Sequence, residues 1–247
     1  MAGHSKWANI RFRKGAQDAK RGKIFTKLIR EISIAARIGG PDESSNPRLR
    51  DAVIKSLKAN MKRDTIDNAI KRGAGGLDEA NMMEMSYEGY GPGGIAILVD
   101  CLSDNKNRTV SEVRHAFTKN GGNLGTDGSV SYLFNKQGEI LLEKASDADR
   151  LMDIAIDAGA TDVAILDDGQ VEVITDEESY HSVLSKLQEN GFAVDESQLV
   201  RRASILVDLD NEMAVKVDKL IDMLEDLDDV QAVYSNAQYP ENFLMEG

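Results

Sequence analysis

The sequence predicts an α+β fold in which a helical N-terminal region precedes two α/β domains, one inserted into the other. Three patterns predict it. Apolar residues recur every three or four positions between residues 20 and 72. After the glycine-rich segment 73–76, apolar residues recur at every second position, which is typical of strands with one buried face. Residues 138–200 then alternate between strand and helix patterns in the βαββαβ order of a ferredoxin-like domain.

Three amphipathic helices are expected before residue 76, preceded by a mobile arm. The first helix begins at Lys20 and ends at Gly39. Asn46-Pro47 starts the second, because Asn caps free backbone N–H groups and Pro in the first turn loses no hydrogen bond. Asp64 opens the third helix and Gly73 closes it. These helices predict a small bundle.

The patterns after residue 76 predict two α/β domains. In the first part, strands are expected at 82–88, 94–101 and 129–135, and a helix at 107–120. A βαββαβ series follows, with strands at 138–144, 161–166, 170–175 and 193–200 and helices at 146–158 and 177–190. This is the ferredoxin-like order. The chain ends with a strand at 203–209, a helix at 211–227 and a strand at 230–235.

The last three elements cannot complete a second ferredoxin-like sheet unless they join residues 82–135. We therefore expect one ferredoxin-like domain to be interrupted by another that is inserted whole. The predicted domains are residues 1–76, residues 77–136 with 203–247, and the inserted residues 137–202.

The charge of the chain changes sign at Gly73. Residues 1–72 carry 18 Lys and Arg against 7 Asp and Glu, whereas residues 73–247 carry 12 against 35. The overall net charge of −12 therefore conceals a strongly basic N-terminal third. Such a surplus creates a positive field that attracts a polyanion. The alternative is a solvated basic helix face that binds nothing in particular.

The densest cluster of basic residues is the candidate nucleic-acid site. Lysine meets phosphate as a point charge, arginine as a bidentate fork, and a tryptophan stacks on an unpaired base. The cluster comprises Lys6, Trp7, Arg11, Arg13, Lys14, Lys20, Arg21 and Lys23. Lys27 and Arg30 continue it on the basic face of the first helix, and Arg48 and Arg50 are presented by the second.

Two glycine-rich segments resemble phosphate-binding loops in composition. Gly89 to Gly94 match the spacing G-x-G-x-x-G, but an apolar strand follows where that motif requires a helix, so a tight turn is favoured. Gly121 to Gly128 contain four glycines, which permit close backbone approach to a phosphate. A helix end followed by an irregular turn is the favoured interpretation of this second loop.

No pattern in the chain predicts an enzyme, a metal site, a cofactor or a small-molecule substrate. The single cysteine, Cys101, and three scattered histidines offer no ligand spacing and no nucleophile–base pair. The longest apolar run, Ile95 to Val99, is far shorter than the roughly 20 residues that span a bilayer. We therefore expect a cytoplasmic protein without membrane contact.

Long motifs in the chain resemble the YebC/PmpR family, to which a mitochondrial translational activator of cytochrome oxidase is related. The motifs are MAGHSKWANI at 1–10, RGKIFTK at 21–27, NPRLR at 46–50, YEGYGPGG at 87–94, NRTVSEVR at 107–114, GGNLGTDGSV at 121–130 and DMLEDLDDVQ at 222–231. The likeness is weakest over residues 136–204.

This resemblance implies three domains, the last inserted into the middle one, and no enzyme activity. It implies a cytoplasmic DNA-binding transcriptional regulator, while relatives act in translation or relieve ribosomes stalled on proline-rich sequences. The matched basic positions would supply the nucleic-acid contacts: Lys6, Arg11, Arg13, Lys14, Lys20, Arg21, Lys23, Lys27, Arg48 and Arg50.

The residues and the resemblance favour different nucleic acids. A basic arm with one tryptophan suits single strands and RNA crevices at least as well as a duplex. In that alternative the protein is a ribosome-associated factor, with ribosomal RNA and ribosomal proteins as partners. We rank DNA first on the resemblance alone.

Overall fold

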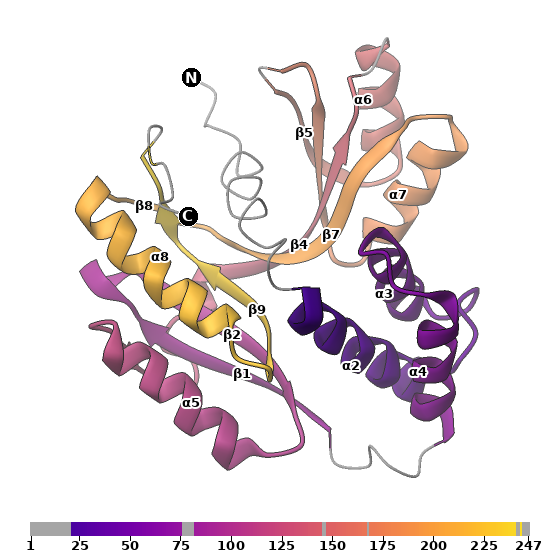
Figure 1. Cartoon of the computed structure of the whole chain (residues 1–247). Helices are drawn as coiled ribbons and strands as arrows, with labels where there is room; N and C mark the ends of the chain where they lie inside the picture. The colour runs from indigo at the N-terminus through magenta and orange to yellow at the C-terminus, as the bar shows by residue number, and fades with distance from the viewer. Residues whose placement is uncertain (1–20, 76–81, 145–146, 167, 241–242, 244–247) are drawn as a thin grey trace. The chain divides into compact units, whose positions relative to one another are not determined.

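The computed structural model describes residues 21–75, 82–144, 147–166, 168–240 and 243 (Figure 1). The chain divides into two compact units, residues 1–132 with 205–247, and residues 133–204. The predicted three-domain division stays a prediction. None of the helices in the described ranges has the length and apolar character needed to cross a membrane.

The N-terminal helices form a bundle around an aliphatic core. They are α2 (Arg21–Gly39), α3 (Pro47–Lys58) and α4 (Arg63–Gly75). Ile32, Leu49 and Ile66 are fully buried at their contact, one from each helix. The Asn46 side chain accepts a hydrogen bond from the backbone N–H of Leu49, so the predicted cap of α3 is confirmed.

The glycine predicted to end the third helix lies inside it, since α4 continues to Gly75. A Cβ atom on Gly73 would lie 2.2 Å from the backbone oxygen of Ser33 in α2. Gly73 is therefore required by close helix packing and not by a helix end.

Replacing Gly73 with alanine should separate α2 from α4 and lower the free energy of unfolding by about 1–2 kcal/mol. The higher helix propensity of alanine, about 1 kcal/mol, offsets part of the steric cost. Thermal unfolding followed by circular dichroism measures the change. Gly75→Ala, where a Cβ would meet nothing within 4 Å, is the control. Equal stability of the two variants would contradict the packing argument.

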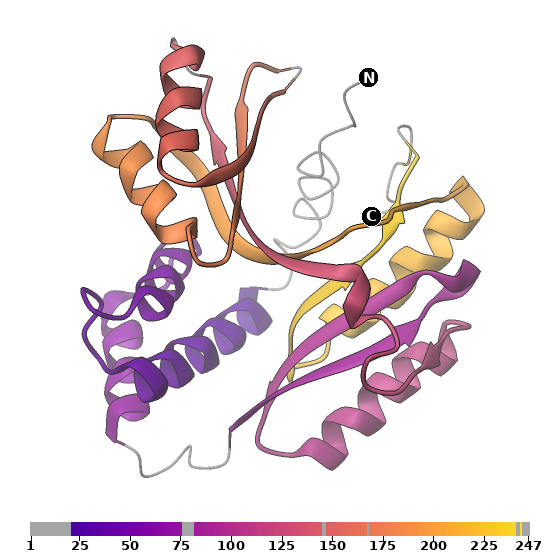
Figure 2. The same ribbon diagram turned by 180° about the vertical axis from the view of Figure 1, so that it is seen from behind.

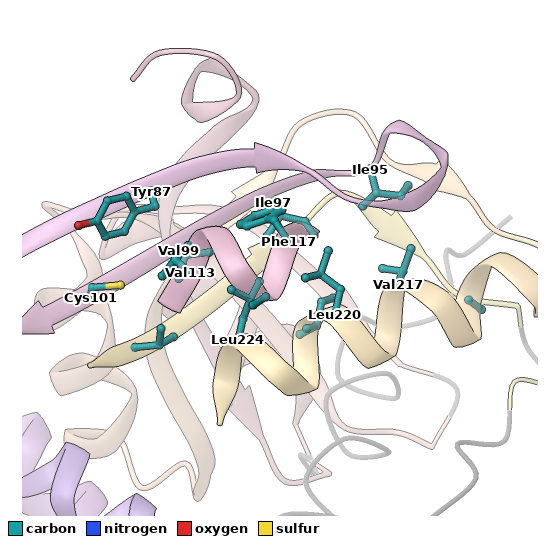
Figure 3. Packing of buried hydrophobic residues seen from close by; sticks show 14 of the residues in the cluster. Tyr87, Ile95, Ile97, Val99, Cys101, Val113, Phe117, Val217, Leu220 and Leu224 are labelled. Atoms are coloured by element: carbon teal, nitrogen blue, oxygen red, sulfur yellow. The ribbon is translucent and has the colours of Figure 1, made fainter. Parts of the chain in front are cut away.

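The larger unit also contains an antiparallel sheet of four strands in the order β3-β1-β2-β9. The strands are β1 (Met83–Tyr90), β2 (Ala96–Ser103), β3 (Asn123–Leu124) and β9 (Val230–Ser235). Helices α5 (Lys106–Lys119) and α8 (Asn211–Glu225) pack on one face, as Figure 3 shows. Ile97, Phe117 and Leu220 are fully buried between them. Two short strands, β8 (Val207–Asp208) and β10 (Ala237–Gln238), pair in parallel beside this sheet.

Residues 133–204 form the predicted ferredoxin-like unit. Its elements are β4 (Phe134–Leu142), α6 (Ala148–Asp157), β5 (Ala160–Ile165), β6 (Val171–Asp176), α7 (Tyr180–Glu189) and β7 (Val194–Ala203). The strands pair antiparallel in the order β5-β6-β4-β7, and α6 and α7 cover one face (Figure 2). Ile140, Leu151 and Tyr180 are fully buried between the layers. The α+β fold class is confirmed.

Two predicted strands differ from the structure. Residues 131–133 form a short 3₁₀ turn, and the strand expected at 129–135 begins only at Phe134, as β4. The reason is a side chain: the Glu88 carboxylate accepts hydrogen bonds from the backbone N–H groups of Val130 and Ser131, which are then not free for a strand partner. The strand expected at 203–209 is reduced to Val207–Asp208.

Candidate nucleic-acid interface

The structure describes the side chains of only some residues predicted to contact nucleic acid. Arg21 is the first residue of α2. The earlier positions lie outside the described residues: Lys6, Trp7, Arg11, Arg13, Lys14 and Lys20. The predicted residues with described side chains are Lys23, Lys27, Arg30, Arg48 and Arg50.

The basic face of α2 contacts the end of α8 and the loop after it. Lys23, Lys27 and Arg30 recur every three or four residues, so they lie on one side of the helix. Their nitrogens donate to the backbone oxygens of residues 226, 225 and 228, at 3.0, 2.7 and 2.6 Å respectively. A helix C-terminus has unpaired carbonyls and a negative dipole end, which cations satisfy. Lys23 and Lys27 therefore cap α8, and Arg30 binds the loop that follows it.

Lys27 is half-buried in this contact. Burial lowers the pKa of Lys27, while the negative charges of Glu225 and Asp226 act in the opposite direction. A lysine in this position has exchanged water for fixed protein oxygens. Its contact with a phosphate would require it to leave those oxygens.

Asp229 joins α2 to α5. The residue is 1 % exposed, and its carboxylate accepts hydrogen bonds from Arg30 at 3.0 Å and from Arg108 at 2.8 Å. The hydroxyls of Ser103 and Thr109 donate to it as well, at 2.9 and 2.8 Å. Burial alone would raise the pKa of Asp229, but the hydrogen bonds from Arg108, Thr109 and Ser103 outweigh burial and lower it. The group is therefore a stable anion held by two arginines.

Arg48 is also engaged within the chain. Its Nε and Nη2 donate to the two carboxylate oxygens of Glu31 at 2.6 and 3.0 Å, and Nη2 also binds Glu84. Burial acts to lower the pKa of Arg48, but the hydrogen bonds and negative charges of Glu31 and Glu84 outweigh burial and raise it. Arg50 makes longer contacts, with the backbone oxygens of Glu43 and Ser44 at 3.3 and 3.4 Å.

Other cations of the helical region face solvent. They are exposed and form no ion pair with another residue in the described part of the chain: Lys55, Lys62, Lys71 and Arg72. These positions were not among the predicted site residues. Lys55 and Arg72 lie in the last turns of α3 and α4, where a cation also stabilises the helix dipole. The sequence pattern therefore did not separate a binding role from a capping role.

The two glycine-rich loops pack against each other. A Cβ on Gly89 would lie 2.6 Å from the backbone oxygen of Asn123, and one on Gly122 would lie 2.6 Å from that of Tyr90. The N–H of Gly128 donates to the Glu88 carboxylate at 2.8 Å. The second loop thus directs backbone N–H groups at the carboxylate of Glu88. This agrees with its interpretation as a helix end followed by an irregular turn.

Two side chains with reactive groups, Cys101 and His115, lie in the described residues of β2 and α5. Cys101 is buried, and burial together with Asp100 and Asp229 raises the pKa of its thiol to about 12. It is therefore not a thiolate at neutral pH. His115 is exposed on the outer side of α5.

Comparison with known proteins gives one consistent result. Residues 5–76 match the model of the TACO1/YebC protein N-terminal domain, and residues 82–237 match that of the TACO1/YebC second and third domain. A probable transcriptional regulatory protein of Legionella pneumophila is 71% identical over 99% of this chain and 98% of its own. One from Francisella tularensis is 55% identical over the same shares. The crystal structure of a conserved hypothetical protein of Aquifex aeolicus shares 45% identity and a TM-score of 0.81, covering 93% of this chain and 95% of its own.

Proposed function

Because the chain belongs to the TACO1/YebC family, we propose that it is a cytoplasmic, non-enzymatic regulator of gene expression that binds DNA and controls transcription. The observation that carries the proposal is the separation of charge, with 18 Lys and Arg against 7 acids in residues 1–72 and 12 against 35 afterwards. Relatives of this length and identity are named probable transcriptional regulatory proteins. A basic region on an otherwise acidic protein directs the contact to that region of the chain.

The contacts of α2 divide the basic residues into two groups with different roles. Lys23, Lys27 and Arg30 hold the helical region against the end of α8. Residues 1–20 carry five Lys and Arg and a single acid. This arm and the exposed cations of α3 and α4 supply the phosphate contacts in our proposal. Lys55, Lys71 and Arg72 of these helices form no ion pair with a residue that the structure describes, so they are available to a phosphate.

Replacing Arg11, Arg13 and Lys14 with alanine should weaken binding to every duplex sequence by a similar factor. Every phosphate that is no longer neutralised lowers the slope of log K against log salt by about 0.9, so the slope should fall by up to about 2.7. Fluorescence anisotropy with a mixed-sequence DNA duplex measures it. The matched control replaces three exposed lysines of the acidic part with alanine, namely Lys186, Lys216 and Lys219. A slope unchanged from wild type would rule the arm residues out as phosphate contacts.

A ribosome-associated translation factor is the second candidate, favoured by the lone Trp7 among the cations of the arm. Such a factor should co-sediment with ribosomes at physiological salt and detach at high salt. Comparing that association with duplex affinity in the same buffer separates the two functions. Ribosome binding without duplex binding would overturn the transcriptional proposal.

A further inference from the structure

The end of α8 places anionic groups on the basic face of α2. We call residues 225–228 the acidic segment, because three of its four residues are Asp or Glu. The Nζ atom of Lys23 donates to the backbone oxygen of Asp226 at 3.0 Å. That of Lys27 donates to the backbone oxygen of Glu225 at 2.7 Å. Charge-assisted hydrogen bonds to carboxylate and phosphate oxygens use the same lysine donors. The segment therefore takes up donors that a phosphodiester backbone would use.

The negative charge of the acidic segment acts on both lysines. The Asp226 carboxylate lies 3.8 Å from the Nζ atom of Lys23. The charges of all three acids in the segment oppose the lowering of the Lys27 pKa by burial. The side chains of Lys23 and Asp226 are 46% and 40% exposed, so solvent and its ions reach this contact. An ion pair that solvent reaches is weak, and another anion can displace it.

Capping of α8 does not account for these acids. The unpaired carbonyls of a helix C-terminus accept cations by themselves, so a structural cap needs no acid there. Acids at this end are unfavourable, because it carries the negative pole of the helix dipole. Yet the last turn of α8 has no basic residue and includes Glu225, and Asp226 and Asp228 follow it. The acidic segment thus holds more negative charge than a cap of α8 requires.

A neighbouring pair, Arg30 and Asp229, holds α2 in place beside the acidic segment. Asp229 is buried and binds Arg108 as well. Leu224 and Val230, on either side of the segment, are fully buried in the core of the sheet. The two sides of the contact are therefore anchored by groups other than the two lysines. Lysine has a flexible four-carbon side chain, so each lysine can turn to another acceptor while α2 stays in place.

Resting on the proposed function, we propose that the acidic segment is an internal competitor of nucleic acid for Lys23 and Lys27. In the free protein the segment occupies the two lysines, and a phosphodiester backbone displaces it on binding. The protein then binds more weakly than its basic charge allows, because the binding-competent state is not the state of the free protein. The dependence on salt is smaller as well. Each phosphate releases a counterion, but the acid that is displaced attracts one from solution.

The test compares three full-length proteins by fluorescence anisotropy across a salt series. One is wild type. The acid variant loses the charges of the segment but keeps its backbone oxygens and the Arg30–Asp229 pair: Glu225→Gln, Asp226→Asn and Asp228→Asn. The control loses three exposed charges of α6: Asp149→Asn, Asp153→Asn and Asp157→Asn. The probes are a mixed-sequence DNA duplex and a single-stranded RNA with the same number of phosphates.

The acid variant should bind up to about 30-fold more tightly than wild type near 0.15 M salt. Its slope of log K against log salt should be steeper by up to about 1.8 on the duplex and about 1.4 on the single strand. Two lysines then gain phosphates without displacing an acid. The control measures the effect of a lower net negative charge by itself and should gain less. Damage to the fold cannot steepen the slope, so misfolding would not imitate the expected result.

A second substitution distinguishes competition from a purely structural contact. Lys23→Gln should change the slope little in wild type, where the acidic segment already offsets this charge. In the acid variant the same substitution should lower the slope on the duplex by about 0.9. A lysine that only holds α2 against α8 would have the same effect in both proteins, because the two changes would be additive. Equal effects of Lys23→Gln in the two proteins would overturn the inference.

The outcomes separate this inference from the proposed function. If wild type does not bind the duplex, and the expected gains are seen on the RNA, the proposed function fails and the inference stands. If wild type binds and the acid variant gains no more than the control on either probe, only the inference is overturned. Failure of wild type and the acid variant to bind either probe would overturn both.

Discussion

Replacing Asp229 with asparagine is expected to lower the free energy of unfolding by about 3–5 kcal/mol. The carboxylate is buried and binds Arg30, Arg108, Ser103 and Thr109. An asparagine has one acceptor oxygen where the carboxylate has two, and its amide would point donors at two arginines. The variant therefore leaves cationic donors without an acceptor at the junction of α2, α5 and the loop before β9.

The effect of the substitution should depend on pH. Because the native pKa of Asp229 lies below its ordinary value, its charge stabilises the fold at pH values above about 4. That contribution is lost as pH falls through the native pKa, where wild type also becomes neutral at this position. The difference in stability between wild type and Asp229→Asn should therefore be largest near neutral pH and shrink in acid.

Asp228→Asn is the matched control, since residue 228 is exposed and contributes a backbone oxygen to Arg30, which the substitution retains. Thermal unfolding at neutral pH should show a lower midpoint for Asp229→Asn, by about 2–4 °C for each kcal/mol, and little change for the control. Equal midpoints for the two variants would show that the buried carboxylate is not a stabilising centre.

Local patterns predicted most of the fold. The Asn46 cap, the helix of residues 106–119 and the strand order of residues 133–204 all depend on residues close in sequence or on a known topology. The two-residue strand β3 escaped prediction because two residues show no period. The strand wrongly expected at 129–135 shows the alternation of apolar and polar residues that is typical of strands. However, the backbone N–H of Val130 donates to the carboxylate of Glu88, 42 residues earlier, and is not free to pair with a strand. The spacing of apolar residues along the sequence does not indicate hydrogen bonds between residues so far apart.

The sequence predicted the candidate site only from the surplus of Lys and Arg in residues 1–72. That count does not show which of the basic side chains are available to contact a phosphate. Lys23, Lys27 and Arg30 bind partners 198–203 positions later in the chain, a pairing that the sequence alone does not indicate.

Glu88→Gln is the second substitution with a large expected effect, a loss of about 3 kcal/mol in the free energy of unfolding. One carboxylate oxygen of Glu88 accepts the N–H of Gly128, at 2.8 Å, and the other accepts those of Val130 and Ser131, both at 2.7 Å. Glutamine replaces one of these oxygens with an NH₂ group. At least one backbone donor then faces another donor, and the remaining bonds lose the negative charge that strengthens them.

The pH dependence of this effect follows from the same geometry. Burial would raise the pKa of Glu88, but the N–H donors of Val130, Gly128 and Ser131 outweigh burial and lower it. The carboxylate therefore stabilises the loop above its ordinary pKa, near 4.3, and its contribution disappears as pH falls through the lower native value. Wild type and Glu88→Gln should converge in stability in acid.

Asp127→Asn removes the same charge from an exposed position of the same loop and is the control. At neutral pH, amide hydrogen exchange should be faster at Gly128, Val130 and Ser131 in Glu88→Gln, with the unfolding midpoint about 6–12 °C lower. The control should retain wild-type protection at these amides. Protected amides in Glu88→Gln would mean that the loop is held by its packing against residues 89–94, with the carboxylate contributing little.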